Sequence, residues 1–486
     1  MRCSTSAKVD NRRGRANRRE IVSQAQTNRR QVIDRQSTEP QAASAPARAK
    51  RPLFLQRRFW PIWTTLSLGT FADNTLRQAL LIGIPYGVVS TPGFNNPDNA
   101  MPIIGALLPL AILLFSPLAG QLADKYETAA MMRRTKFAEI GLMAVAAFAF
   151  AAKLGGLAIF MLFAMGAQSA FFSPVRVSAM PKYLATDELV RGNGLCNAGL
   201  FGFILLGYGV GGALIVQPDG GLKVGATLVT AASLGFAASL FAPAIGANAP
   251  DLKLRLNWFA LAIDMVRLTA RAPGVAPPLI GFGAFFLLTT AVSVLTPLLA
   301  RDTLNGDALT ATALNGLFAL GVGVGAIVAA ALPKTRTNLG VAGASVIAAG
   351  GLTIAIALAA PAIAPSEGEL QLSDLIATAE RIAFCLALVA TAALMGVYIA
   401  PLQAAMQRRA PTASRARIMA VSAIANAAFA IPGSLSVLLI TRTNAPPEAG
   451  LIGVGVGMLA IGGVMARRRN VLPAGRYDEA FSPPSN

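Results

Sequence analysis

The sequence predicts an all-α integral membrane protein whose twelve spanning helices form two pseudo-symmetric six-helix halves. Three observations lead to this fold class: a low charge content, the segregation of that charge, and an internal repeat. The chain has 486 residues, of which 54% are hydrophobic and only 13% are charged. A soluble domain usually carries about twice that charged fraction. The composition therefore favours a chain that is largely surrounded by lipid.

Uncharged stretches mark the individual spans. We take ten windows of 18 or more residues without Asp, Glu, Lys or Arg as candidate spans, because a helix needs about 20 apolar residues to cross a bilayer. Two further apolar stretches, about 59–89 and 137–152, are interrupted by single charges and bring the number to twelve. Helices are expected because lipid offers backbone groups no hydrogen-bond partners and the stretches do not alternate with period two. The ten windows are 101–123, 154–175, 192–218, 224–250, 272–300, 308–333, 337–366, 382–407, 418–441 and 449–466.

Positive charge is concentrated at the N-terminus. The net charge is +19, and residues 1–58 contribute +11 of it through fifteen Lys or Arg against four acids. We predict a disordered basic tail on the cytoplasmic side and no nucleic-acid partner, because the segment lacks apolar periodicity. Two other roles stay open for it, namely contact with anionic headgroups and service as an organellar transit peptide.

The side chains of common catalytic and metal sites are missing or scattered. Histidine is absent, which excludes Ser-His-Asp triads and histidine metal sites. Three cysteines, Cys3, Cys196 and Cys385, are widely spaced and form neither a disulfide framework nor a metal pattern. We therefore expect no catalytic residue, no metal and no cofactor.

Lys and Arg gather in alternate connections, and this sets the predicted orientation. Bases occur after the second, fourth, sixth, eighth, tenth and twelfth spans, whereas the connection between the first two spans has none. Cytoplasmic loops carry the excess of Lys and Arg, so both termini are predicted to be cytoplasmic. The bases counted are Lys125, Arg133, Arg134, Lys136, Lys182, Arg191, Lys253, Arg255, Arg267, Arg271, Lys334, Arg336, Arg408, Arg409, Arg415, Arg417, Arg467, Arg468 and Arg469.

A long connection and a repeat divide the membrane portion in two. Ser173-Pro174-Val175-Arg176 near the end of the fourth span has a counterpart, Ala400-Pro401-Leu402-Gln403, near the end of the tenth, about 227 residues later. Repeated halves indicate a pseudo-twofold transport fold with its site between them. The predicted organisation is a tail at 1–58, a half at 59–245, a cytoplasmic linker with an amphipathic stretch at 246–275, a half at 276–467, and a cytoplasmic tail at 468–486.

The first span holds the strongest candidate site. Asp73 and Arg77 are four residues apart, which places both on one helix face, and Asn74 and Gln78 flank them. A charge in mid-membrane costs about 2.5–3.5 kcal/mol on insertion scales, so such residues usually face a cavity or a partner. Two interpretations stay open: a mutual ion pair that holds the bundle together, or a site in which Asp73 binds a cationic group and Arg77 an anionic one.

Arg176, just after a proline, is the second candidate. Its planar guanidinium is suited to a phosphate, although an arginine near the interface also snorkels towards water. Asn193 and Asn197 in the fifth span are candidate cavity residues. Other amides within spans are Gln168, Asn315, Gln403 and Asn426, and hydrogen bonds between helices explain most such residues.

Two further motifs are assigned to gating and to helix packing, and not to substrate contact. Asp124 and Lys125 end the second span, and Arg133 and Arg134 follow. Acids and bases at helix ends are suited to latching a bundle, so we predict a gating role for these four. The glycine runs Gly207–Gly212 and Gly321–Gly325 lie within apolar spans, with no preceding strand and no following lysine. They are typical of close helix packing and not of a nucleotide loop.

Over residues 59–467 the chain resembles the lysophospholipid transporter family of the major facilitator superfamily. The likeness is carried by FADNTLRQAL, GQLADKYETAAMMRR, GAQSAFFSPVRVSAMPKYLATDELVRGNGL and PLQAAMQRRAPTASRARIMA. The chain departs from the family pattern at Ala72, where an asparagine is usual, at Asn197, where many members carry a glutamate, and at Ser422 and Ala423, where an asparagine pair is common.

The resemblance implies a twelve-helix major facilitator bundle in a bacterial inner membrane. It also implies alternating-access transport of lysophosphatidylethanolamine-like lipids to the inner leaflet, where a separate acyltransferase would restore the second chain. By position it marks Asp73, Asn74, Arg77, Arg176 and Asn193 for the headgroup and Asp124 with Lys125 for the loop. A proton-driven drug or metabolite exporter and, remotely, an intramembrane acyltransferase stay open as alternatives.

Overall fold

In the computed structural model, the described residues from Leu53 onwards belong to one compact unit. The structure describes residues 56–91, 96–184, 188–244, 274–331, 339–365, 368–409 and 415–467, together with a few isolated positions. The long helices in this part are α2 (Trp60–Gly83), α3 (Ala100–Lys125), α4 (Thr128–Ala151), α5 (Gly155–Tyr183), α6 (Leu189–Ile215), α7 (Gly220–Leu240), α9 (Ala276–Leu298), α10 (Ala308–Ala331), α11 (Leu339–Ile363), α12 (Ala379–Arg409), α13 (Arg415–Leu435) and α15 (Pro447–Arg467). Short turns of helix are η2 (Pro97–Asn99), η3 (Leu299–Thr303), η4 (Leu372–Ile376) and α14 (Leu438–Thr443).

These helices confirm the predicted all-α membrane fold. Ten of them are long and apolar enough to cross a bilayer. The other two long helices, α2 and α4, correspond to the two stretches that charges interrupt. α4 carries the buried pair Lys136 and Glu139, and α2 carries Asp73 and Arg77, which explains why these two helices are less apolar than the rest.

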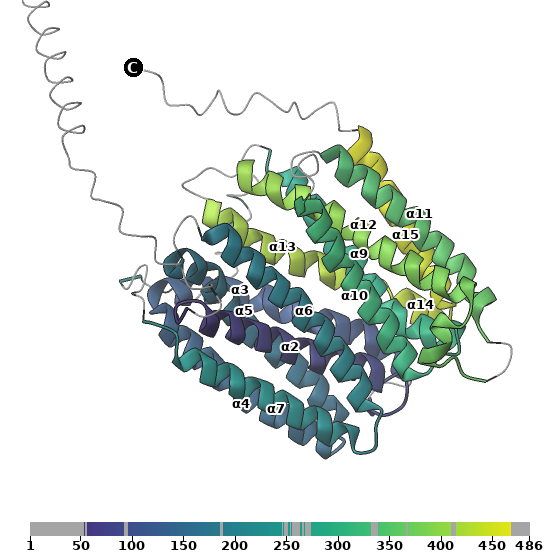
Figure 1. The fold of residues 1–486 in the computed structure, drawn as a ribbon, viewed down its shortest axis with the longest axis horizontal. Helices are drawn as coiled ribbons and strands as arrows, with labels where there is room; N and C mark the ends of the chain where they lie inside the picture. The colour runs from purple at the N-terminus through teal and green to yellow at the C-terminus, as the bar shows by residue number, and fades with distance from the viewer. Residues whose placement is uncertain are drawn as a thin grey trace, which may run out of the picture. The chain divides into compact units, whose positions relative to one another are not determined.

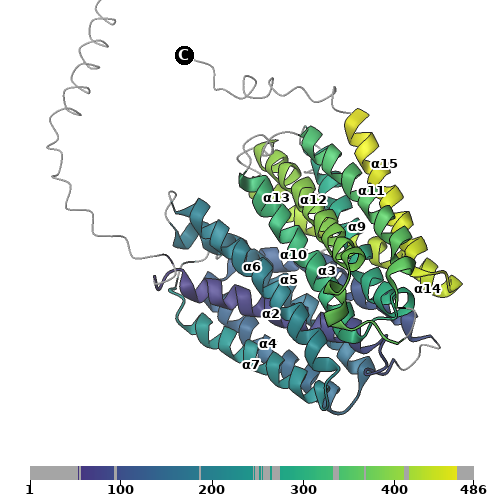
Figure 2. The same ribbon diagram turned by 45° about the vertical axis from the view of Figure 1, so that its right-hand side comes forward.

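The two halves repeat the same helix pairing. In the first half α2 packs on α6, α3 on α5, and α4 on α7; in the second, α9 packs on α13, α10 on α12, and α11 on α15. The halves meet where α3 packs on α13 and where α6 packs on α10. In the repeat, α3 corresponds to α10 and α6 corresponds to α13, so the two contacts are equivalent. Figures 1 and 2 place α4 with α7 at one margin of the bundle and α11 with α15 at the opposite margin. This arrangement confirms two pseudo-symmetric six-helix halves.

The start of α4 corrects one prediction. The helix begins at Thr128, because the side chain of Glu127 accepts hydrogen bonds from the backbone N–H groups of Ala129 at 2.8 Å and Ala130 at 2.6 Å. A carboxylate at this position caps the free N–H groups and favours the helix dipole. Lys136 therefore lies two turns inside α4 and is buried, so its placement in the connecting loop was wrong.

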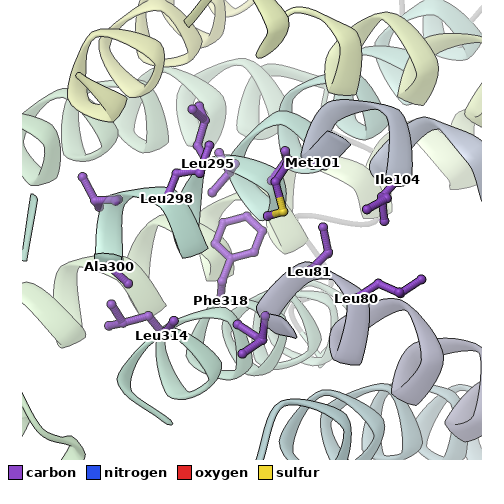
Figure 3. Packing of buried hydrophobic residues seen from close by; sticks show 14 of the residues in the cluster. Leu80, Leu81, Met101, Ile104, Leu295, Leu298, Ala300, Leu314 and Phe318 are labelled. Carbon is purple, nitrogen blue, oxygen red and sulfur yellow. The ribbon is translucent and has the colours of Figure 1, made fainter. Parts of the chain in front are cut away.

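The halves are in tight contact at the end of the bundle where α2 ends, α3 begins and α9 ends, which we call the Gly83 end. Figure 3 shows Leu81 of α2 and Met101 of α3 pointing towards Phe318 of α10. These are joined in the same buried cluster by Leu298 of α9. Because the cluster combines residues of both halves, it packs the halves against each other at this end.

Glycines allow several helices to approach closely, as predicted for both glycine runs. A Cβ atom on Gly325 of α10 would lie 1.9 Å from the carbonyl oxygen of Ala393 in α12, whereas one on Gly323 would lie no closer than 3.5 Å to Phe201. We expect Gly325→Ala to lower stability by about 1–3 kcal/mol through overpacking. Gly323→Ala, the matched control, is expected to change it little. Equal midpoints for both variants in a detergent unfolding titration would contradict the packing interpretation.

Some predictions concern residues outside the described part. The basic tail lies there, apart from a few residues before α2, and so does the C-terminal tail after Arg467. In the predicted linker, 246–275, only isolated positions are described, among them an exposed ion pair between Arg267 and Asp264 with an N–O distance of 3.9 Å.

Candidate functional site

Arg77 of α2 joins the two halves in the middle of the bundle. Its Nη1 donates to the hydroxyl of Tyr208 in α6 at 2.7 Å, and its Nη2 donates to Ser293 Oγ in α9 at 2.8 Å. Neither partner carries a charge. No ion pair among the described residues includes Arg77, so the mutual pair with Asp73 does not form there. The guanidinium is thus held between the halves by neutral hydroxyls, which an anionic group is able to displace.

A pair of amides makes a second polar contact between the halves, one residue further along α2. Asn315 of α10 donates from Nδ2 to Gln78 Oε1 at 3.3 Å and to the carbonyl oxygen of Ser293 at 3.3 Å. Gln78 and Asn315 are both almost fully buried. The sequence marked both as polar residues within spans, and the structure brings them together beside Arg77.

Asp73 turns towards the first half and away from Arg77. Its Oδ2 accepts a hydrogen bond from Ser169 Oγ of α5 at 2.8 Å, and its Oδ1 is buried without a partner. The neighbouring Asn74 donates from Nδ2 to the carbonyl oxygen of Thr70 at 2.7 Å, within its own helix. One carboxylate oxygen of Asp73 is therefore available to a further donor.

A buried ion pair that sequence reasoning missed lies in the same half. Lys136 Nζ of α4 is 2.6 Å from Glu139 Oε2, and both side chains are 1% exposed. Gln168 of α5 donates to the same Glu139 oxygen at 2.9 Å, and the Lys136 ammonium lies 4.8 Å from the centre of the Phe172 ring. The available signal was the spacing of three residues between opposite charges, which places them on one face of a helix.

Gly69 of α2 provides the space for this ion pair. A Cβ atom at Gly69 would lie 2.4 Å from Lys136 Nζ and 3.8 Å from Glu139 Oε1. Gly69 precedes Asp73 by one helical turn, so α2 touches the ion pair and carries Asp73 on the same stretch of helix. Asp73, Lys136 and Glu139 therefore lie in one region where α2, α4 and α5 pack together.

A latch between the halves at the Gly83 end was also missed. Arg301 donates from Nη1 and Nη2 to the two carboxylate oxygens of Asp98 at 2.9 and 2.8 Å, and from Nη1 to the carbonyl oxygen of Pro85 at 2.9 Å. Arg301 lies in η3, a π-helical turn that follows Pro297. Proline supplies no N–H group, so the regular ladder breaks and a wider turn forms. Neither Arg301 nor Asp98 belongs to a motif that the sequence made conspicuous.

Two further hydrogen bonds close the same end. Tyr86 donates to the carbonyl oxygen of Gly306 at 2.7 Å, and Ser434 of α13 donates to that of Pro102 in α3 at 2.7 Å. Burial, followed by the charge of Asp307, raises the pKa of Tyr86 well above its ordinary value, so the phenol remains a donor at all physiological pH values. Together with the Arg301 latch, these bonds fix the closed contact of the halves.

The structure describes the side chains of the four predicted gating residues but not those of three predicted headgroup residues. Asp124 is exposed and Lys125 half-buried; Arg133 lies 3.7 Å from Glu127, and the Arg134 guanidinium stands 5.7 Å from the Tyr126 ring centre. Both arginines lie in the first two turns of α4, not in the connection where they were predicted, and they contact residues of the short connection before it. Arg176, Asn193 and Asn197 lie on α5 and α6, but their side chains are outside the described residues.

These features define a polytopic helical membrane protein with a polar site between two six-helix halves. A profile of the Major Facilitator Superfamily matches residues 66–437, and the chain belongs to this superfamily of membrane transporters. Because the superfamily consists of transporters and not of enzymes, the acyltransferase alternative is set aside.

Curated relatives of this chain include lysophospholipid transporters. The chain is 28% identical over 272 residues to the lysophospholipid transporter LplT of Salmonella heidelberg (strain SL476), a match that covers 56% of this chain and 64% of the relative. It is also 28% identical over 275 residues to the protein of the same name from Citrobacter koseri, covering 56% and 65%. The chain therefore matches just under two thirds of the length of these relatives.

Solved structures agree on the fold. A crystal structure of the peptide transporter POT in complex with sulfate has a TM-score of 0.62 at 16% identity and covers 84% of this chain and 94% of that one. A POT family transporter in complex with 5-aminolevulinic acid has a TM-score of 0.62 at 12% identity, covering 85% and 96%. At these identities the likeness shows the fold alone.

Proposed function

We propose that this protein moves lysophospholipids resembling lysophosphatidylethanolamine across the bacterial cytoplasmic membrane to its inner leaflet by alternating access. The names of the curated relatives and the first-span segment FADNTLRQAL support this substrate class. A separate acyltransferase would then restore the second acyl chain. The lysolipid headgroup enters between the halves while its single chain stays in lipid.

The observation that carries the proposal is the pair of opposite charges on α2. Arg77 reaches the boundary between the halves with no acidic partner among the described residues, and Asp73 keeps one oxygen free. Four residues of helix separate them by about 6 Å along the axis, which is on the scale of a phosphoethanolamine headgroup. Arg77 is suited to the phosphate and Asp73 to the ammonium.

The other predicted residues have roles in headgroup binding and in gating during the proposed transport cycle. Arg176, Asn193 and Asn197 would contribute further headgroup contacts, and Asp124, Lys125, Arg133 and Arg134 would act as the gate on the cytoplasmic side. With both termini cytoplasmic, the Gly83 end faces outwards. In this orientation the described state is closed to the outside, and the headgroup is released on the cytoplasmic side.

Lysolipid transport by reconstituted variants tests the headgroup assignment. We expect Arg77→Ala to reduce uptake of both lysophosphatidylethanolamine and lysophosphatidic acid by about tenfold or more, since a charged hydrogen bond contributes about 1.5–3 kcal/mol. Asp73→Asn should reduce uptake of the first lipid more than the second, because only the first carries an ammonium group. The proposal fails if both variants, equally expressed, transport like the wild type.

A control variant separates these effects from a general loss of charge. Lys223→Ala removes an exposed base of α7 that hydrogen-bonds Gln217, and it should leave uptake unchanged. A chain that exports drugs, moves no lysolipid and stops when the proton gradient is dissipated would instead favour the exporter alternative.

A further inference from the structure

The amide pair between the halves leaves one hydrogen-bond donor and one acceptor unused. Gln78 Oε1 accepts from Asn315 Nδ2 at 3.3 Å, but Gln78 Nε2 and Asn315 Oδ1 are buried and have no partner in the described part of the chain. The two residues are 0% and 1% exposed. A buried polar atom without a partner is costly. Two of them on touching side chains indicate that a further polar group binds here.

Ser293 fixes which end of the Asn315 amide is the nitrogen. Asn315 Nδ2 also donates to the carbonyl oxygen of Ser293 at 3.3 Å, and only the NH₂ end of an amide is able to donate. The same nitrogen faces Gln78, so the Gln78 atom that it meets is the amide oxygen. The unused atoms are therefore a donor on Gln78 and an acceptor on Asn315.

A hydroxyl group matches this pair of unused atoms. Because a hydroxyl both accepts and donates, it takes a hydrogen bond from Gln78 Nε2 and gives one to Asn315 Oδ1. An ammonium group cannot accept from the N–H group, and an ester, ether or phosphate oxygen cannot donate to the amide oxygen. The chemistry of the pair thus selects an alcohol or water, and the position of the pair decides between them.

The amide pair lies beside the guanidinium that is proposed to bind phosphate. Arg77 precedes Gln78 in α2, and its Nη2 donates to Oγ of Ser293, the residue whose carbonyl oxygen accepts from Asn315. A lysophospholipid carries a free hydroxyl on the glycerol carbon next to the one that bears the phosphate ester. The distinctive hydroxyl of the lipid and the amide pair thus lie next to the same phosphate position.

We propose that Gln78 and Asn315 recognise the free glycerol hydroxyl of a lysolipid and thereby discriminate against diacyl phospholipids. This role rests on the proposed function for the identity of the substrate. Gln78 belongs to α2 and Asn315 to α10, so separation of the halves admits the hydroxyl and their closure encloses it. In a diacyl phospholipid the same oxygen is an ester. It cannot donate to Asn315 Oδ1, and its second acyl chain would have to enter a fully buried space.

Lipid analogues that differ only at this hydroxyl test the proposal with the wild-type protein in proteoliposomes. The probes are lysophosphatidylethanolamine, its deoxy analogue without the hydroxyl, and its methyl ether, whose oxygen accepts but does not donate. We expect uptake at limiting lipid concentration to fall about tenfold or more for the deoxy analogue, since a site built for a hydroxyl is left with unpaired polar groups. The methyl ether should also be taken up more slowly than the parent lipid.

A double variant tests whether the amides cause this preference. Gln78→Met with Asn315→Leu replaces both amides by apolar side chains of similar size, and the preference for the parent lipid over the deoxy analogue should disappear. The control is Thr391→Val, which removes a buried hydroxyl of α12 that also lacks a partner among the described residues. It should keep the wild-type preference. Size-exclusion chromatography checks folding, and the comparison of lipids on the wild type stands without any variant.

The outcomes separate this proposal from the proposed function. Equal uptake of the parent lipid and the deoxy analogue by the wild type overturns hydroxyl recognition and leaves lysolipid transport intact, because a bridging water then serves the amides. A folded double variant that keeps the wild-type preference also overturns it. Absence of uptake of every lysolipid by the wild type overturns the transport function and hydroxyl recognition together.

Discussion

Lys136→Met is expected to destabilise the protein by about 3–4 kcal/mol at pH 7. It leaves the Glu139 carboxylate buried without the ammonium that lies 2.6 Å away, and both side chains are 1% exposed. Removing one partner of a buried pair costs about 3–5 kcal/mol. Unfolding by a denaturing detergent, followed by circular dichroism, measures the change.

The double variant Lys136→Met with Glu139→Gln is the control. It removes both charges and should recover most of the stability, since the amide needs no counter-charge. A double variant as unstable as the single one would show that the ammonium matters for packing and not for charge.

Arg301→Ala is expected to open the Gly83 end. The residue makes a bidentate ion pair with Asp98 and a further hydrogen bond to Pro85, all from one half to the other. The side chains are 26% and 21% exposed, so solvent screens the pair only partly. A loss of about 1–3 kcal/mol would raise the ratio of open to closed molecules by about 5- to 150-fold. Spin labels at Val88→Cys and Ile376→Cys, introduced after replacement of the native cysteines, report the separation.

Arg381 offers a matched control at the same end. Its guanidinium hydrogen-bonds the carbonyl oxygens of Ile363 and Asp374, which belong to its own half. Arg381→Ala should therefore leave the distance distribution unchanged, and Arg301→Lys should fall between wild type and Arg301→Ala because an ammonium cannot make the bidentate contact. Equal distributions for Arg301→Ala and Arg381→Ala would show that the apolar cluster alone holds this end closed.

Much of the fold followed from charge segregation. Because a charge is costly in lipid, uncharged windows indicate spanning helices, and these windows located ten spans. The repeat near Arg176 located the two halves. The error at Lys136 has the same physical origin. The topological rule counts bases as markers of loops, and it fails where a base is compensated inside the bundle, as Glu139 and Gln168 compensate Lys136.

The site was predictable only in part. Asp73, Arg77, Gln78 and Asn315 stand out as polar residues in apolar surroundings, but which partner each one meets depends on helix rotation and packing. That is why the Asp73–Arg77 spacing was compatible with an ion pair that the structure does not form. The Arg301 latch joins residues about 200 positions apart in the chain, and no local pattern indicates such a contact.

Uptake of labelled lysophosphatidylethanolamine by proteoliposomes containing the wild-type protein tests the central claim most directly. The account predicts protein-dependent movement of the lipid across the bilayer, saturable and faster than in protein-free vesicles. Identical rates in vesicles with and without correctly folded protein would contradict it.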